Sequence, residues 1–172
     1  MKIERVSKSF GGLRAVNDLN MEIREHSINA LIGPNGAGKT TTVNLLTGVL
    51  QPDTGAIELK GENVVGRPEY MIARSGVRRT FQNLKLFGRM TTLENVMVGA
   101  QGQSTSLMRY IIDPFYASKM EKQLRAQAEE AIAYVGLDAY TNKRVMDLPY
   151  GIQKRIEIAR ALVAKPEVLF LD

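Results

Sequence analysis

At 172 residues the chain is long enough to bury a hydrophobic core, and its 44% hydrophobic and 24% charged residues are typical of a soluble globular protein. It contains no cysteine, which excludes disulfide bonds and thiolate metal sites, and no apolar run approaches the roughly 20 residues that span a bilayer. The net charge of +5 is modest and scattered, so it permits phosphate ligands, nucleic acid or an anionic membrane surface without choosing among them.

The first elements that we predict alternate between strand and helix. Residues 27–32 form a short apolar run that indicates a buried strand, and a helix is expected from about Gly38. Gly48 is placed to end that helix, with Pro52 just beyond it. Residues 56–59 alternate between apolar and polar side chains, as a half-exposed strand does.

The second half of the chain is mostly helical in pattern. Residues 95–106 contain glycines and polar side chains and are expected to be partly a loop. Apolar residues recur at helical spacing from about Ser118, with Gly136 at the end, and a second helix is expected to start near Ile152. Residues 168–171 are continuously apolar, like a strand that is covered on both faces in a parallel sheet. This order of elements predicts an α/β core with a helical insertion.

A glycine-rich sequence follows the first expected strand. Residues 33–40, GPNGAGKT, fit the pattern G-x-x-x-x-G-K-[ST] of a phosphate-binding P-loop. Glycines permit the unusual dihedrals that turn successive N–H groups toward a phosphate, and the positive end of the next helix adds to the attraction. Lys39 supplies a charge near the β- and γ-phosphates, the Thr40 hydroxyl can ligate Mg²⁺, and Thr41 can donate to a phosphate. We therefore expect ATP to bind through Gly33, Pro34, Asn35, Gly36, Ala37, Gly38, Lys39, Thr40 and Thr41.

Four further segments resemble motifs of one family. From about Ile3 to Asp172 the chain is similar to the first two thirds of an ABC-transporter nucleotide-binding subunit. Residues 6–12, VSKSFGG, resemble the family's adenine-stacking loop, which implies that Phe10 stacks on the base and Val16 packs nearby. The resemblance implies an ABC-type P-loop NTPase core with a parallel sheet and an inserted helical subdomain.

Two motifs of that family involve the middle of the chain. Residues 79–83, RTFQN, resemble the Q-loop, which implies that Gln82 senses Mg²⁺ and the attacking water and couples to a transmembrane partner. Residues 148–155, LPYGIQKR, occupy the place of the signature L-S-G-G-Q. Pro149 has no hydroxyl for the γ-phosphate of an opposite subunit, so contact would come from the backbone near Tyr150 and Gly151 at the helix start. With a tyrosine in this position, the segment resembles the signature of the subfamily that serves branched-chain amino acid importers and related amide or urea importers.

The last five residues, VLFLD, resemble Walker B, in which an apolar strand ends in a carboxylate. That match implies that Asp172 holds Mg²⁺ through water. The resemblance therefore assigns catalytic roles to Lys39, Gln82 and Asp172, and roles toward Mg²⁺ to Thr40, Gln82 and Asp172. The family's glutamate, D-loop and switch histidine would follow Asp172, and His26 does not match that histidine and is expected at the surface. We therefore expect a chain truncated after Walker B, with the C-terminal part of the core missing, that binds ATP but hydrolyses it poorly.

The resemblance also implies an organisation and a set of partners. Residues 1–86 would be the nucleotide-binding core, 87–147 the helical subdomain with the Q-loop junction, and 148–172 the signature helix and Walker B strand. The parent would be an ATPase that energises an importer for branched-chain amino acids. It would pair with a second ATP-binding subunit, identical or different, contact transmembrane permease subunits, and act indirectly with a substrate-binding protein, at the cytoplasmic face of the cell membrane.

Two other functions stay open from the sequence. One is a nucleotide-binding fragment with little or no hydrolysis. The other is a soluble, non-transport ABC ATPase that acts on nucleic acid or ribosomes. The sequence has no long basic insertion, so we expect no nucleic-acid partner.

Overall fold

The computed structural model describes residues 1–80, 85–100 and 114–171. The chain forms two compact units, Met1–Val77 and Arg78–Asp172. In chain order, the elements of the first unit are β1 (Lys2–Phe10), β2 (Leu13–Glu22), α1 (Lys39–Leu46), β3 (Thr54–Leu59), β4 (Glu62–Asn63) and α2 (Glu69–Arg74).

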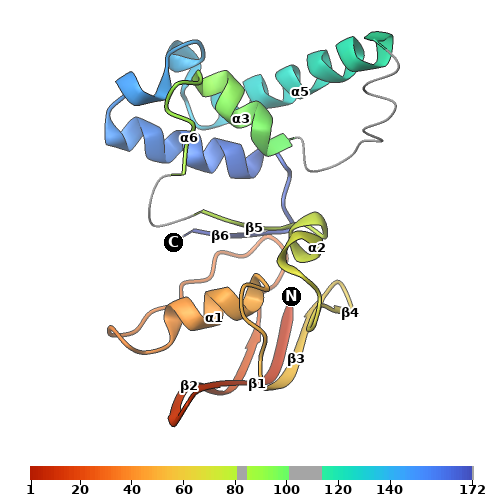
Figure 1. The fold of residues 1–172 in the computed structure, drawn as a ribbon, viewed down its shortest axis with the longest axis vertical. Coiled ribbons are helices and arrows are strands. Elements are labelled where there is room, and N and C mark those ends of the chain that lie inside the picture. The colour runs from red at the N-terminus through yellow and green to blue at the C-terminus, as the bar shows by residue number, and fades with distance from the viewer. Residues whose placement is uncertain (81–84, 101–113, 172) are drawn as a thin grey trace. The chain divides into compact units, whose positions relative to one another are not determined.

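The sheet of the first unit is antiparallel throughout and has the strand order β2-β1-β3-β4 (Figure 1). Its central strand β1 is irregular near Arg5, which has a positive φ of 51°. This irregularity inserts one residue between Ile3 and Val6, and both of these side chains are buried although they are three positions apart. The bulge therefore keeps the apolar side chains of β1 in the core.

The core of the first unit confirms two predictions from the sequence. Helix α1 ends where Gly48 adopts a φ of 78° and donates its N–H to the Leu45 carbonyl at 3.2 Å, as a C-terminal glycine cap does. Ile57 and Leu59 on β3 are buried, with the less buried Glu58 between them. The alternation expected in this strand is therefore present, and the strand begins at Thr54, two residues before the expected start.

The strand expected at residues 27–32 is wrong. This segment has no strand conformation, and none of the ladders among the described residues includes it. Ile28 is 102% exposed and Ile32 is 88% exposed. A strand is held by hydrogen bonds to a neighbouring strand, and an apolar sequence does not supply that neighbour by itself.

The second unit combines helices with a two-stranded sheet (Figure 1). Its elements are β5 (Val77–Arg79), whose first residue is the last of the first unit, α3 (Thr92–Ala100), α5 (Pro114–Tyr134), the 3₁₀ turns η2 (Asp138–Tyr140) and η3 (Val145–Asp147), α6 (Tyr150–Leu162) and β6 (Val168–Phe170). Strand β6 pairs with β5, but its three residues are only partly buried and Leu171 is exposed. The expectation that residues 168–171 are covered on both faces is therefore not met.

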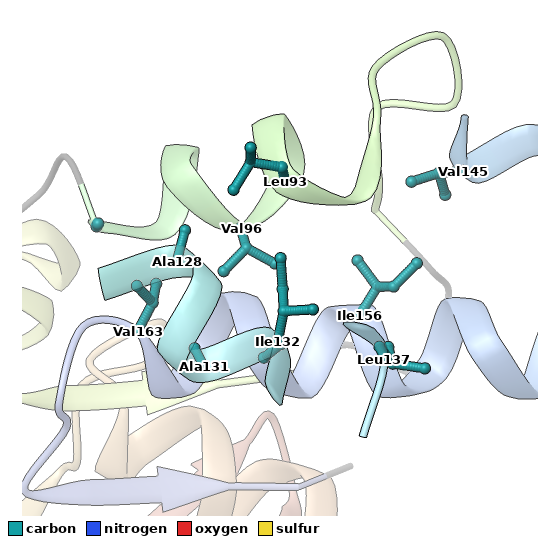
Figure 2. Close-up of a cluster of buried hydrophobic side chains, with 11 residues drawn as sticks. Leu93, Val96, Ala128, Ala131, Ile132, Leu137, Val145, Ile156 and Val163 are labelled. Atoms are coloured by element: carbon teal, nitrogen blue, oxygen red, sulfur yellow. The ribbon is translucent and has the colours of Figure 1, made fainter. Parts of the chain in front are cut away.

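Helices α3, α5 and α6 share one hydrophobic core (Figure 2). The helical pattern predicted for α5 is confirmed: Ala128 and Ala131 are buried in this core, and Leu124 and Val135 pack against it. Both α5 and α6 begin a few residues earlier than predicted. Gly136, with a φ of 65°, ends α5 as expected.

Of the segment 95–106 that was expected to be partly a loop, residues 95–100 are helical, because α3 continues to Ala100. Residues 101–106 lie outside the described part of the chain. Gly99 misled the prediction, because its role is packing and not flexibility. A β-carbon at Gly99 would stand 2.1 Å from the Arg160 carbonyl oxygen on α6, so glycine lets the two helices approach closely.

Candidate functional site

The residues of the predicted P-loop form an exposed turn that leads directly into α1. Gly36 and Gly38 have φ values of 84° and 81°, which favour glycine. The Lys39 ammonium group donates hydrogen bonds of 2.7 Å to the carbonyl oxygens of both Gly33 and Pro34. These bonds hold the lysine charge across the loop, at the start of a helix whose first N–H groups have no partner within the helix. The geometry fits the binding of a polyphosphate.

Strand β2 supports this loop from one side. A β-carbon at Gly38 would lie 2.3 Å from the Ala15 carbonyl oxygen and 3.5 Å from Val16 Cγ2. Val16 itself is buried. The structure therefore places Val16 beside Gly38 of this loop, and its expected place near the adenine stays a prediction.

Phe10 lies at the end of β1, where the chain turns through two glycines into β2. Phe10 is 46% exposed, so this residue is accessible to a ligand. The Lys8 ammonium lies 5.8 Å from the ring centroid and also forms a 2.7 Å ion pair with Asp53. This ion pair keeps the lysine beside the ring, and Lys8 was not among the predicted site residues.

Of the residues expected to contact Mg²⁺, only Thr40 belongs to the described part of the chain. Thr40 is exposed on the first turn of α1, and Thr41 next to it is half-buried. An exposed threonine hydroxyl in this position can ligate a Mg²⁺ ion that is also bound by phosphate oxygens. Among the described residues, no group of three or more acidic or histidine side chains could hold a metal ion.

Gln82 and Asp172 lie outside the described residues, but their neighbours on the chain are placed. The Thr80 N–H donates to the Phe170 carbonyl at 2.9 Å, which continues the β5–β6 pairing. On the other side of residues 81–84, the Lys85 carbonyl accepts a 2.6 Å hydrogen bond from Arg160 Nη1 on α6. No sequence motif indicated this second contact, because its partners are 75 residues apart.

The residues of the predicted signature open helix α6. Pro149 caps the helix in an extended conformation, which suits a residue without an N–H. Tyr150 is 63% exposed, and Gly151 has open space around the position of a β-carbon. Gln153 Nε2 donates to the Leu148 carbonyl at 2.8 Å and fixes the turn before the helix. This helix start is therefore accessible to a ligand or a partner.

The structure gathers the predicted residues into two sets. The first unit holds Phe10, Val16 and the P-loop residues, and the second unit holds Tyr150 and Gly151. His26 is exposed, as expected. In the described part of the chain, no helix is both long and apolar enough to cross a lipid bilayer.

Comparison with known proteins gives one family. A family model described as "ABC transporter" matches residues 16–172. The chain is 39% identical, over its whole length and 68% of the relative, to the high-affinity branched-chain amino acid transport ATP-binding protein BraF of Pseudomonas aeruginosa. It is 43% identical, over 95% of the chain and 64% of the relative, to the ATP-binding protein LivG of Salmonella typhimurium, described with the same transport role. The chain thus spans about two thirds of the length of these relatives.

Solved structures agree with this result. A nucleotide-free ATP-binding cassette from an ABC transporter matches with a TM-score of 0.81 and 26% identity, over 99% of this chain and 67% of that one. The ADP conformation of an ATP-binding cassette of an ABC transporter matches with a TM-score of 0.81 and 26% identity, over 98% of this chain and 66% of that one. The predicted fold class, an α/β P-loop NTPase of ABC type, is confirmed.

Proposed function

Because this chain belongs to the ABC transporter family, we propose that it is the ATP-binding, energy-coupling part of an importer for branched-chain amino acids. The observation that carries the proposal is the P-loop, in which Lys39 bridges two loop carbonyls at the start of α1. The cargo follows from the relatives, whose descriptions name branched-chain amino acid transport.

The phosphate end of ATP is bound at the P-loop in this proposal. Lys39 turns from the loop carbonyls toward the β- and γ-phosphates, and the loop N–H groups donate to phosphate oxygens. Thr41 donates a further hydrogen bond. The exposed ring of Phe10 stacks on the adenine, and the buried Val16 packs near the base. All of these residues lie in the first unit, and in this proposal each one binds or orients part of the nucleotide.

Magnesium would be held by Thr40 together with Gln82 and Asp172. The ion supplies charge neutralisation between the phosphates during hydrolysis. Thr40 presents its hydroxyl at the first turn of α1, and Gln82 orients the attacking water. The assignment of Gln82 and Asp172 rests on their places in the RTFQN and VLFLD segments.

The protein works in this proposal as a pair of ATP-binding subunits on the cytoplasmic face of the membrane. Tyr150 and Gly151 at the open start of α6 meet the γ-phosphate held by the partner subunit. Residues 1–86, 87–147 and 148–172 serve as the core, the helical subdomain and the return segment. The helical subdomain transmits closure to the permease subunits and, through them, to a substrate-binding protein.

The P-loop assignment is tested by calorimetric titration of the chain with Mg-ATP. Lys39→Ala removes the charge that faces the phosphates, so we expect the affinity to fall at least tenfold, which corresponds to about 1.4 kcal/mol. Lys119→Ala, at an exposed lysine of α5, is the matched control and should bind as the unchanged chain does. Equal affinities for all three proteins would refute the assignment.

The cargo and the coupling role need the complete transporter in vesicles. Uptake of labelled leucine should require ATP on the side of the vesicle membrane where this subunit lies. The rate of uptake should be lower in the Gln82→Ala variant. Uptake of urea or an amide, and not of leucine, would show that the proposed cargo is wrong. Leucine uptake at the normal rate in Gln82→Ala would refute the coupling role of Gln82.

A further inference from the structure

Asp53 binds the three residues that lead into Phe10. It lies between α1 and β3 in the chain and directly precedes β3. Its N–H donates to the Ser7 carbonyl at 2.9 Å, and its Oδ2 accepts from the Ser9 N–H at 2.7 Å. Its Oδ1 forms an ion pair of 2.7 Å with the Lys8 ammonium. Asp53 therefore holds the end of β1 up to the residue before Phe10.

The Lys8 side chain connects these contacts to the aromatic ring. Its ammonium lies over the Phe10 ring at 5.8 Å from the centroid, which is within the range of a cation–π contact. The lysine side chain is only 19% exposed. A lysine near a surface turn usually extends into water, because its ammonium is strongly hydrated. Here the carboxylate of Asp53 and the ring of Phe10 take the place of part of that water.

The turn that follows Phe10 gives the ring little support. Gly11 has a φ of 56°, and a β-carbon on Gly11 or Gly12 would meet nothing within 4 Å in the described part of the chain. Leu13, which pairs with Phe10 across the turn, is exposed. An exposed side chain changes rotamer within picoseconds to nanoseconds unless a contact holds it. The contact with Lys8 therefore restricts the ring at a place where the turn does not.

We propose that Asp53 and Lys8 are positioning residues for Phe10, and that they hold its ring in the orientation in which an adenine base stacks on it. This role rests on the proposed function, in which Phe10 stacks on the adenine of ATP. Lys8 and Asp53 act on the base through the ring and not by contact with the nucleotide. They therefore contribute to recognition of the base, whereas the P-loop binds the phosphates.

A restricted ring binds a base more tightly than a mobile ring does. Stacking fixes the ring in one orientation, and a side chain that is already restricted loses less conformational entropy when the base binds. Inorganic tripolyphosphate has no base, so its affinity should not depend on the ring. The ratio of the affinities for Mg-ATP and Mg-tripolyphosphate thus isolates the contribution of the base.

Strand β1 offers a matched control for the test. Lys2 lies on the same strand and forms an ion pair with Glu4, so Lys2→Met removes one charge and one ion pair away from Phe10. Lys8→Arg keeps a cation that can bind both a carboxylate and an aromatic ring. We would titrate the unchanged chain, Lys8→Met, Lys8→Arg and Lys2→Met with Mg-ATP and with Mg-tripolyphosphate in a calorimeter.

Phe10→Ala should lower the affinity ratio about tenfold, because stacking of one base makes a contribution of that size. Lys8→Met should lower the ratio about threefold, which is the scale of an exposed cation–π contact. Asp53→Asn should act in the same direction as Lys8→Met, Lys8→Arg should restore most of the ratio, and Lys2→Met should leave it unchanged. An unchanged ratio in Lys8→Met, or an equal fall in Lys2→Met, would overturn the positioning role.

A double-mutant cycle distinguishes action through the ring from direct contact with the nucleotide. If Lys8 acts through Phe10, Lys8→Met should have no further effect on the ratio in a chain that already carries Phe10→Ala. The same fall in both backgrounds would overturn the positioning role, because Lys8 would then act on the nucleotide without the ring.

Failure of the proposed function gives a different result. If the unchanged chain binds neither Mg-ATP nor Mg-tripolyphosphate, the P-loop assignment fails. An unchanged ratio in Phe10→Ala would refute the stacking itself, and with it any role of Lys8 in recognition of the base.

NMR of the Phe10 ring without nucleotide tests the contact independently of binding. The ring signals should shift in Lys8→Met and in Asp53→Asn, and they should stay in place in Lys2→Met. Ring signals that do not change in Lys8→Met would show that Lys8 does not hold the ring, and they would overturn the proposal whether or not the chain binds ATP.

Discussion

Gly38 lies so close to Ala15 that a β-carbon on Gly38 would stand 2.3 Å from the Ala15 carbonyl oxygen. Gly38 also has a φ of 81°, which L-amino acids with side chains rarely adopt. The P-loop therefore needs glycine at this position for two separate reasons, the backbone dihedral and the contact with β2.

Gly38→Ala should destabilise the chain by more than the dihedral alone explains. The left-handed backbone costs about 1–2 kcal/mol for a residue with a β-carbon, and the collision with a carbonyl oxygen adds to it. We expect a lower midpoint of urea unfolding and a loss of ATP binding, measured by circular dichroism and calorimetry.

The control for that prediction is Gly61→Ala. Gly61 has nearly the same φ, 80°, but its β-carbon would meet nothing within 4 Å. It should therefore show the dihedral cost alone and keep ATP binding. Equal losses of stability in the two variants would mean that the contact with Ala15 contributes nothing.

Gly99→Ala should destabilise the helical unit, although alanine is favoured in helices by about 1 kcal/mol. Its β-carbon would stand 2.1 Å from the Arg160 carbonyl oxygen, so α3 and α6 would have to separate. Overpacking of this kind costs about 1–3 kcal/mol, which exceeds the gain in propensity. Thermal unfolding measures the difference.

The variant to compare with Gly99→Ala is Gly151→Ala, at another glycine within a helix. The space around Gly151 is open, so alanine there should leave the unfolding temperature unchanged or raise it. A stabilising effect of Gly99→Ala, like that expected of Gly151→Ala, would contradict the close crossing of α3 and α6.

Thr91 and Glu94 form a reciprocal capping box at the start of α3. Glu94 Oε2 accepts from the Thr91 N–H at 2.7 Å, and Thr91 Oγ1 accepts from the Glu94 N–H at 3.2 Å. Thr91→Ala should therefore cost about 1 kcal/mol of unfolding free energy, measured by urea titration. Glu94→Gln keeps an acceptor and should cost less. A neutral Thr91→Ala variant would show that the box adds no stability.

Asp53 gives the chain a predictable response to acid. Two hydrogen bonds lower the pKa of the Asp53 carboxyl group below its usual value. The bond from the Lys8 ammonium has the larger effect, and the bond from the Ser9 N–H has the smaller one. Because this pKa is lower in the folded state, the stabilisation is present above the unfolded-state pKa of about 3.9 and is lost as the pH falls through the folded-state pKa.

Titration of the Asp53 carboxyl carbon by NMR measures this shift directly. Lys8→Met removes the larger of its two causes, so the pKa of Asp53 should rise toward the ordinary value. The difference in urea midpoint between pH 7 and pH 3 should shrink in the same variant. An unchanged titration curve in Lys8→Met would show that the ion pair does not stabilise the carboxylate.

The sequence by itself determined the local chemistry of this protein. Residues 33–40 predict a phosphate-binding loop because a backbone that curls around an anion needs glycines and one lysine at fixed spacing. The cap at Gly48 and the apolar spacing of α5 are equally local, since they depend on neighbours within a few residues. The cap and the helix could be predicted, and the structure contains both.

Only the tertiary structure decided which distant segments meet. The apolar run at residues 27–32 has the composition of a strand but no ladder partner among the described residues, and a ladder cannot be read from one segment. Gly99 looks like a loop residue until its helix is seen against Arg160. The bond from Arg160 to Lys85 joins positions 75 residues apart, and such pairings depend on how helices pack, which no local pattern encodes.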